Sequence, residues 1–359
     1  MKRFFCQCRQ EIFFNDLSCG ICGRDLVYDP VAKTMWSGEV RSDFKFYTKT
    51  ETSAEYMNFR VCQLRESVVK CNWVIGNNEP QSECQCVSCR TTHIIPDMGL
   101  DKNPRRWHLL ERSKRRMLYN LLDLKLFCGE GRLSDNLRFD FLEDRRSHPH
   151  IELEFVLTGH NNGLITINAA EADESFLHTM KEQLGERYRT LLGHFRHEIA
   201  HYYWCLLIEK PGLQTRFREV FGDERQDYAL ALEKHYQKMA TKRWTFRYIT
   251  PYASSHPHED WAETWAHYLH MVDTLETAVS YGLSVYEPKK NDFDHWFKEW
   301  AQVSQIMNAL NRSMGMADPY PFFLSPIVEG KMRFIDEIVD SAHLFDADLG
   351  SYFQESRQT

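Results

Sequence analysis

Two histidines and a glutamate in the middle of the chain have the spacing of a hydrolytic metal site. Residues 197–201 are His-Glu-Ile-Ala-His. On a helix, positions four apart lie on one face about one turn apart, so His197 and His201 can bind one metal ion. Glu198 then lies beside the remaining ligands of the metal. This arrangement is typical of zinc hydrolases, in which the glutamate is the general base for a zinc-bound water.

The segment that carries this motif is predicted to be a buried helix. It contains no proline or internal glycine from His194 to Lys210, and apolar residues recur through it. A buried helix that turns two histidines and a glutamate inward needs a polar partner, and zinc is the natural one. Because the motif has only three fixed letters, a surface helix with two histidines stays open as the alternative.

A catalytic zinc usually has three protein ligands and one position for water, so a third ligand must come from another segment. The best candidate is a predicted helix capped by Ser255 and begun by Pro257, in which Glu259 and Glu263 lie one turn apart on the same face. The pair resembles glutamate-type zincins, in which the first acid binds zinc and the second accepts a hydrogen bond from a ligand histidine. We assign Glu259 to zinc and Glu263 to that supporting role, with the reverse assignment open.

The mechanism expected of such a site follows from elementary chemistry. Zinc lowers the pKa of a bound water toward about 7, and Glu198 takes its proton as the water attacks a carbonyl polarised by the metal. Glu198 then passes the proton to the leaving amine. A donor to the oxyanion is also needed, and the sequence does not choose among six candidates: Tyr202, Tyr203, Tyr248, Tyr252, His267 and His270.

The cysteines predict two further metal sites, both structural. Nine of the eleven lie between Cys6 and Cys89, and in a reducing compartment such clustering favours metal over disulfides. The first site combines two pairs of thiols, with Phe13 and Phe14 between the pairs available to cover the metal: Cys6 with Cys8, and Cys19 with Cys22. We therefore expect a closed tetrahedral zinc site here.

The second cluster offers five cysteines for four places. Cys86 and Cys89 have the preferred spacing of two intervening residues, and Cys62 and Cys71 complete the set. Cys84 is left over, although it could take the place of Cys86. With the histidine site, the sequence predicts three zinc ions per chain, one catalytic and two structural.

The chain is long enough for two domains, and the patterns predict an α+β fold with a boundary near residue 98. Residues 1–98 form a cysteine-rich zinc-ribbon region, and residues 99–359 form a zincin-like domain with a small sheet and a largely helical remainder. Strands at 151–157 and 164–168 are expected to form a hairpin through the Asn162-Gly163 turn. Helices are expected over 105–126 and within 183–210. The basic side of the first is interpreted as solvated: Arg105, Arg106, Arg112, Lys114, Arg115 and Arg116.

Charge and hydropathy argue against nucleic-acid binding and membrane insertion, and the first residues bear on the cellular compartment. The formal net charge of −7 makes general nucleic-acid binding unlikely, because phosphate neutralisation needs a surplus of lysine and arginine. No run approaches the roughly 20 apolar residues of a membrane span. The first residues reach Cys6 before a signal-peptide core can begin, so we expect a cytoplasmic protein.

Nearly the whole chain resembles a bacterial family of zinc-binding metallopeptidases that carry an N-terminal zinc-ribbon domain. The resemblance rests on these strings: FCQC at 5–8, CGICG at 19–23, CVSCR at 86–90, LTGH at 157–160, NAAEAD at 168–173, YRTLLGHFRHE at 188–198, FGDER at 221–225, DWAE at 260–263 and NRSMG at 311–315. One departure is Ala200, where many such helices carry glycine. Since alanine is small and favours helix, no loss of zinc binding is expected.

The leading hypothesis is a zinc-dependent peptidase that acts on a protein or peptide, with the ribbon stabilising the chain or binding a protein partner. The family label does not imply what is cleaved. The alternative is a non-catalytic zinc-binding adaptor that uses the ribbon to bind protein or nucleic acid. Glu198 argues against the alternative, because a structural metal site needs no base. A third hypothesis, a ribbon that binds nucleic acid beside an accessory hydrolase, is disfavoured by the net charge.

Overall fold

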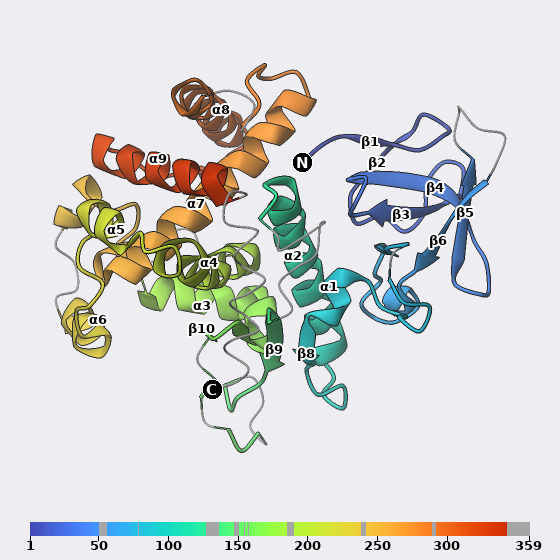
Figure 1. Ribbon diagram of the computed structural model, residues 1–359, viewed down its shortest axis with the longest axis horizontal. Helices are drawn as coiled ribbons and strands as arrows, with labels where there is room; N and C mark the ends of the chain where they lie inside the picture. The colour runs from blue at the N-terminus through green and yellow to red at the C-terminus, as the bar shows by residue number, and fades with distance from the viewer. Residues whose placement is uncertain are drawn as a thin grey trace. The chain divides into compact units, whose positions relative to one another are not determined.

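The computed structural model describes residues 1–49, 56–77, 79–126, 136–146, 151–153, 155–156, 158–184, 190–237, 242–288 and 292–342. Its contacts divide the chain into two compact units (Figure 1). The first unit is Arg3–Phe176, and the second consists of Leu177–Thr359 together with Met1–Lys2. The predicted domain boundary near residue 98 falls inside the first unit and stays a prediction. In the described ranges, no helix is long and apolar enough to cross a membrane.

The first unit begins with an antiparallel sheet whose neighbours follow one another along the chain. Its strands are β3 (Asp25–Asp29), β4 (Thr34–Val40), β5 (Lys45–Lys49), β6 (Tyr56–Val61) and β7 (Val74–Ile75). Tyr28 also forms a parallel bridge with Trp73, so the two edges of the sheet approach each other. Five apolar side chains fill the inside: Val27, Phe46, Phe59, Val61 and Val74. The cysteines of the two predicted thiol sites lie in three places around this sheet: the short hairpin of β1 (Phe4–Phe5) and β2 (Glu11–Ile12), the segments next to β3, β6 and β7, and the short helix that follows β7.

A second sheet of the same unit confirms the predicted turn but corrects the hairpin. It has the order β10-β11-β9-β8, with β8 (Thr92–Ile94), β9 (Arg138–Leu142), β10 (Gly159–Asn161) and β11 (Leu164–Asn168). The turn at Asn162 and Gly163 has positive φ at both residues, as expected for Asn-Gly. However, the first arm is β10, and the described residues of 151–157 form no strand.

The reason lies in a buried carboxylate that competes for the backbone of that segment. Asp144 is fully buried and accepts hydrogen bonds from the Val156 amide and from the Asn168 side chain, both at 2.8 Å. The Arg145 amide donates to the carbonyl of Leu153 at 3.0 Å. These bonds hold Leu153 and Val156 against the loop that follows β9, so these two residues do not extend the hairpin.

The long helix α2 (Asn103–Asp123) lies close to its predicted range, but its basic side is not uniformly solvated. Arg106, Lys114 and Arg115 are buried, which contradicts the sequence-based interpretation for these three residues. Each is compensated by negative charge: Arg106 bonds Asp173 at 2.6 Å, and Lys114 bonds the buried Glu111 at 3.1 Å. Arg115 lies beside the second thiol cluster, described below.

The second unit is helical. Its helices are α4 (Leu191–Trp204), α5 (Gln214–Phe221), α6 (Tyr228–Gln237), α7 (Pro257–Ser280), α8 (Phe293–Ser313) and α9 (Pro326–Ser341), and α3 (Glu174–Leu184) crosses the boundary between the units. The predicted helical segment 183–210 therefore contains the end of α3 and all of α4, which Thr190 caps by accepting a bond from the Gly193 amide. A π-helical turn at Cys205–Glu209 follows α4.

The central contact of this unit joins α4 to α7. The Trp261 indole donates to the backbone carbonyl of Ala200 at 2.9 Å, and both residues are fully buried. A small residue at position 200 lets the indole reach the backbone of α4. The predicted cap of α7 is wrong by one residue: the imidazole of His256 accepts from the His258 amide, whereas the Ser255 hydroxyl donates to the Tyr252 carbonyl.

A buried ion pair fixes α7 against α9. The Lys331 ammonium lies 2.6 Å from the Asp260 carboxylate, and both side chains are almost fully buried. Burial raises the pKa of Asp260 to about 7, although the charge of Lys331 acts in the opposite direction. Lys331 also donates to the carbonyl of Arg247 at 2.6 Å.

Replacing Lys331→Met should destabilise the second unit by about 3 kcal/mol, because it leaves a buried carboxylate without its cation. The double variant Asp260→Asn/Lys331→Met should recover most of that loss, since neither charge is then buried. Thermal and urea unfolding of the parent, both single variants and the double variant would measure the coupling. A Lys331→Met protein as stable as the parent would contradict this role.

Candidate functional site

Helix α4 presents His197 and His201 one turn apart on the same face. Their Nε2 atoms lie 3.3 Å from each other, and the ring planes are inclined by 73°. His197 is 12% exposed and His201 20%, so both rings are shielded without being sealed from solvent. This is the predicted one-face placement of residues four apart on a helix.

Glu259, at the start of α7, supplies the third group. Its Oε2 lies 3.0 Å from Nε2 of His197, and its Oε1 lies 3.7 Å from Nε2 of His201. Nitrogen and oxygen ligands of one tetrahedral zinc, each about 2.1 Å from the metal, lie about 3.4 Å apart. The carboxylate is 2% exposed, and its Oε2 makes no hydrogen bond within the described ranges. The three groups therefore fit one zinc ion.

Glu263 contacts the other side of the same imidazole. Its Oε1 lies 2.7 Å from Nδ1 of His197, the ring nitrogen that faces away from Glu259. A carboxylate on Nδ1 fixes the tautomer that leaves Nε2 as a lone-pair donor to a metal. Glu259 thus lies beside the Nε2 atoms of both histidines, and Glu263 lies on the opposite side of the His197 ring. The assignment of Glu259 to zinc stays a prediction.

The electrostatics reflect the two carboxylates. Burial would lower the pKa of His197, but the carboxylates of Glu259 and Glu263 beside its ring raise it well above the usual value. Burial would raise the pKa of Glu259, but the neighbouring imidazoles of His197 and His201 lower it to about 2. A metal ion bound here would meet an ionised carboxylate and would compete with a proton for Nε2 of His197.

Glu198 follows His197 on α4 and is 7% exposed. Its charge, together with the larger effects of burial and of Glu259, raises the pKa of Tyr228. The Tyr228 hydroxyl donates to Oε1 of Glu259 at 2.8 Å. Because the charge of Glu198 reaches this hydroxyl, Glu198 lies near the three metal-ligand candidates. No spacing rule points to Tyr228, which only the folded chain brings to the site from α6.

The six candidate oxyanion donors lie in different surroundings. The ring centroid of Tyr252 is 6.0 Å from that of His197. His267 is hydrogen-bonded to the Tyr320 hydroxyl at 3.0 Å, and His270 stacks on the same ring at 5.6 Å. The remaining three rings contact other groups. Tyr202 packs edge to face on Tyr203, Tyr203 stacks on Trp265, and the Lys331 ammonium lies over the ring of Tyr248. Tyr252 is thus the candidate that a described contact brings to His197.

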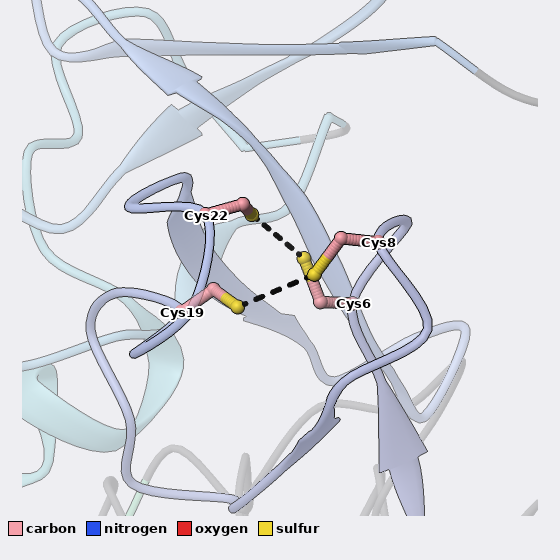
Figure 2. Close-up of side chains that lie close together, drawn as sticks. All are labelled: Cys6, Cys8, Cys19 and Cys22. Atoms are coloured by element: carbon pink, nitrogen blue, oxygen red, sulfur yellow. Dashed lines mark hydrogen bonds between the residues drawn. The ribbon is translucent and has the colours of Figure 1, made fainter.

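The first thiol cluster contains the four predicted cysteines (Figure 2). The Sγ atoms of Cys6 and Cys22 lie 3.5 Å apart, and those of Cys8 and Cys19 lie 3.6 Å apart. Thiolates bound to one tetrahedral zinc, each about 2.3 Å from the metal, are about 3.8 Å apart. The group therefore has the dimensions of a zinc site.

The turn around Cys22 favours its thiolate form. The backbone amide of Arg24 lowers the pKa of Cys22 to about 6. The tight turn that brings this amide round uses Gly23 at φ +72°, a conformation that suits glycine. Of the two predicted covering residues, Phe14 is buried, whereas Phe13 is 66% exposed.

The second thiol cluster is fully buried and contains the favoured set of cysteines: Cys62, Cys71, Cys86 and Cys89. Cys86 precedes the short helix α1 (Val87–Arg90), and its sulfur lies 3.6 Å from that of Cys71. Cys84 is exposed and is not part of the group. The buried Arg115 lies close enough that thiolate charge, Cys71 first, raises its pKa against the effect of burial. A cation there offsets the negative charge of four buried thiolates.

Comparisons with known proteins identify two families along the chain. The family described as "Putative zinc-binding metallo-peptidase" matches residues 103–338, and a zinc-ribbon domain family matches residues 3–100. Two proteins described only as uncharacterised, from Mycobacterium bovis and Mycobacterium tuberculosis, are each 34% identical over 354 residues. The alignments cover 95% of this chain and 96% of each relative. No solved structure matches.

The three groups predict three zinc ions in the native protein. Elemental analysis of protein purified without chelators should give about three zinc per chain, and the double variant His197→Ala/His201→Ala should give about two. The double variant should keep the thermal stability of the first unit, because both thiol clusters are untouched. One zinc in the parent protein would contradict the two thiol sites.

The roles of the two carboxylates can be separated by amide substitution. Glu259→Gln should abolish tight zinc binding at the histidine site, because it removes a charged ligand. Glu263→Gln should weaken it by about 10- to 100-fold, the effect expected of a group that only orients a ligand. Competition titration with a chromophoric chelator, with the thiol sites kept loaded, would measure both. A larger loss with Glu263→Gln would favour the reverse assignment.

Proposed function

The chain belongs to the family of zinc-binding metallopeptidases, and from that membership we propose that it hydrolyses peptide bonds at a zinc ion. In this proposal His197, His201 and Glu259 hold the metal. Glu198 is the general base and Glu263 orients His197. The substrate is a protein or peptide.

One observation carries the proposal: the group formed by His197, His201 and Glu259 offers fewer protein ligands than either thiol cluster. Both thiol clusters offer four protein ligands, as closed structural sites do, whereas the histidine group offers three among the described residues. Three ligands leave a coordination position for water or a substrate carbonyl. A carboxylate next to one ligand in sequence, Glu198, is then available as a base, which a structural site does not need.

The chemistry assigned to the protein's own groups is proton transfer and orientation. A bound zinc would acidify a water and polarise the scissile carbonyl. Glu198 would accept a proton from the attacking water and deliver it to the nitrogen of the leaving amine. Its low exposure strengthens its interactions, because few waters screen its charge. Glu263 keeps Nε2 of His197 directed inward throughout.

The thiol clusters have a supporting role in this proposal. Small ribbon regions bury little apolar surface, so bound metal supplies much of their folding free energy. Exposed apolar side chains of the first cluster region, Phe13 and Ile21, favour a second role for it as a surface that binds a protein partner. A non-catalytic adaptor would need this surface alone and would leave Glu198 without a task.

The decisive variant is Glu198→Gln, which keeps the shape of the side chain and removes the base. Cleavage of a whole-proteome extract should fall by about 10²- to 10⁴-fold while zinc content stays unchanged. Glu337→Gln on α9, where the carboxylate is 54% exposed, is the matched control and should cleave like the parent. Equal fragment patterns from Glu198→Gln and parent protein, both with full zinc, would disprove catalysis at this site.

A further inference from the structure

Tyr228 reaches the buried carboxylate of Glu259 from an exposed helix. Its hydroxyl donates to Oε1 at 2.8 Å. The residue as a whole is 44% exposed, and none of the described side chains of α6 is buried, whereas Glu259 is 2% exposed. The Tyr228 hydroxyl therefore links this exposed helix to the buried carboxylate of the metal-ligand group.

The two oxygens of Glu259 have different surroundings. Oε1 accepts the Tyr228 hydroxyl and lies 3.7 Å from Nε2 of His201. Oε2 is buried, makes no hydrogen bond within the described ranges, and lies 3.0 Å from Nε2 of His197. One oxygen is thus satisfied by the protein, and the other is left for a metal.

The position of Tyr228 is itself fixed by the residue that caps α7. The Tyr228 ring packs edge to face on His256, with centroids 5.2 Å apart. Nδ1 of His256 accepts from the His258 amide, which leaves Nε2 as the N–H that donates to the carbonyl of Gln226 at 3.2 Å. His256 therefore holds the chain that leads into α6 against the start of α7, directly beside Glu259.

From these contacts we infer that Tyr228 is a positioning residue that makes Glu259 bind its metal through Oε2 alone. The inference rests on the metal site of the proposed function and adds the ligation mode of its carboxylate. A carboxylate that used both oxygens would fill the position that water needs at a four-coordinate zinc. By occupying Oε1, Tyr228 keeps that position open.

The first test is metal affinity of the full chain, with zinc retained in the thiol clusters and the histidine site emptied by dialysis against dipicolinate. Tyr228→Phe removes only the hydroxyl and should weaken zinc binding at this site by about 10- to 100-fold. Tyr236→Phe makes the same chemical change on the same helix, where the residue is 47% exposed, and should bind like the parent. Tyr228→Leu should match Tyr228→Phe, because the hydroxyl and not the ring is required.

The second readout is the visible spectrum of cobalt(II) added to the emptied site. Four-coordinate cobalt absorbs much more strongly than five-coordinate cobalt, so the spectrum reports how many oxygens Glu259 supplies. The parent and Tyr236→Phe should give the intense four-coordinate spectrum. Tyr228→Phe should lose that intensity, since the freed Oε1 can then bind as well. A change in folding alone would not produce this shift.

The outcomes separate the two levels of the proposal. A parent protein that takes up no metal at the histidine site overturns both the inference and the proposed function. Normal uptake by the parent, with Tyr228→Phe unchanged in affinity and in cobalt spectrum, overturns the role of Tyr228 and leaves the proposed function standing. Normal binding by Tyr228→Phe with loss only in Tyr228→Leu would also overturn it, because packing would then be the cause.

Discussion

The chemistry available to the second unit depends on the contact between α4 and α7. Ala200 is small enough for the Trp261 indole to reach its carbonyl, and this bond sets the two helices close together. His197 and His201 come from one helix and Glu259 from the other, so a shift of about an ångström between them would separate groups that now lie at zinc-ligand distances. The buried pair of Asp260 and Lys331 fixes the next residue of α7 against α9 and limits such a shift.

Several buried charges among the described residues lie beside a group of opposite charge. The four thiols of the second cluster are accompanied by Arg115, and Arg106 bonds Asp173. Glu259 is the instructive case, because one of its oxygens accepts a tyrosine hydroxyl and the other accepts no hydrogen bond within the described ranges. Burying a carboxylate oxygen in this way is costly without a cation, which is why a metal explains the arrangement better than a histidine ion pair.

The three metal-ligand groups also differ in exposure. The second thiol cluster is entirely buried, the first has two exposed cysteines, and the histidine group is partly open. Exposure therefore does not separate a structural from a reactive site in this chain. The number of ligands does: each thiol cluster offers four groups, and the histidine group offers three among the described residues.

The sequence alone determined the features that depend on local spacing. Four residues on a helix bring His197 and His201 to one face, and two intervening residues bring Cys19 and Cys22 to one metal, whatever surrounds them. The tertiary structure decided what depends on distant segments: that Arg115 is buried beside thiols, that Asp144 holds Val156 away from the hairpin, and that Tyr228 reaches Glu259. No periodicity encodes these contacts, because each joins elements whose separation in the chain carries no information about their distance in space.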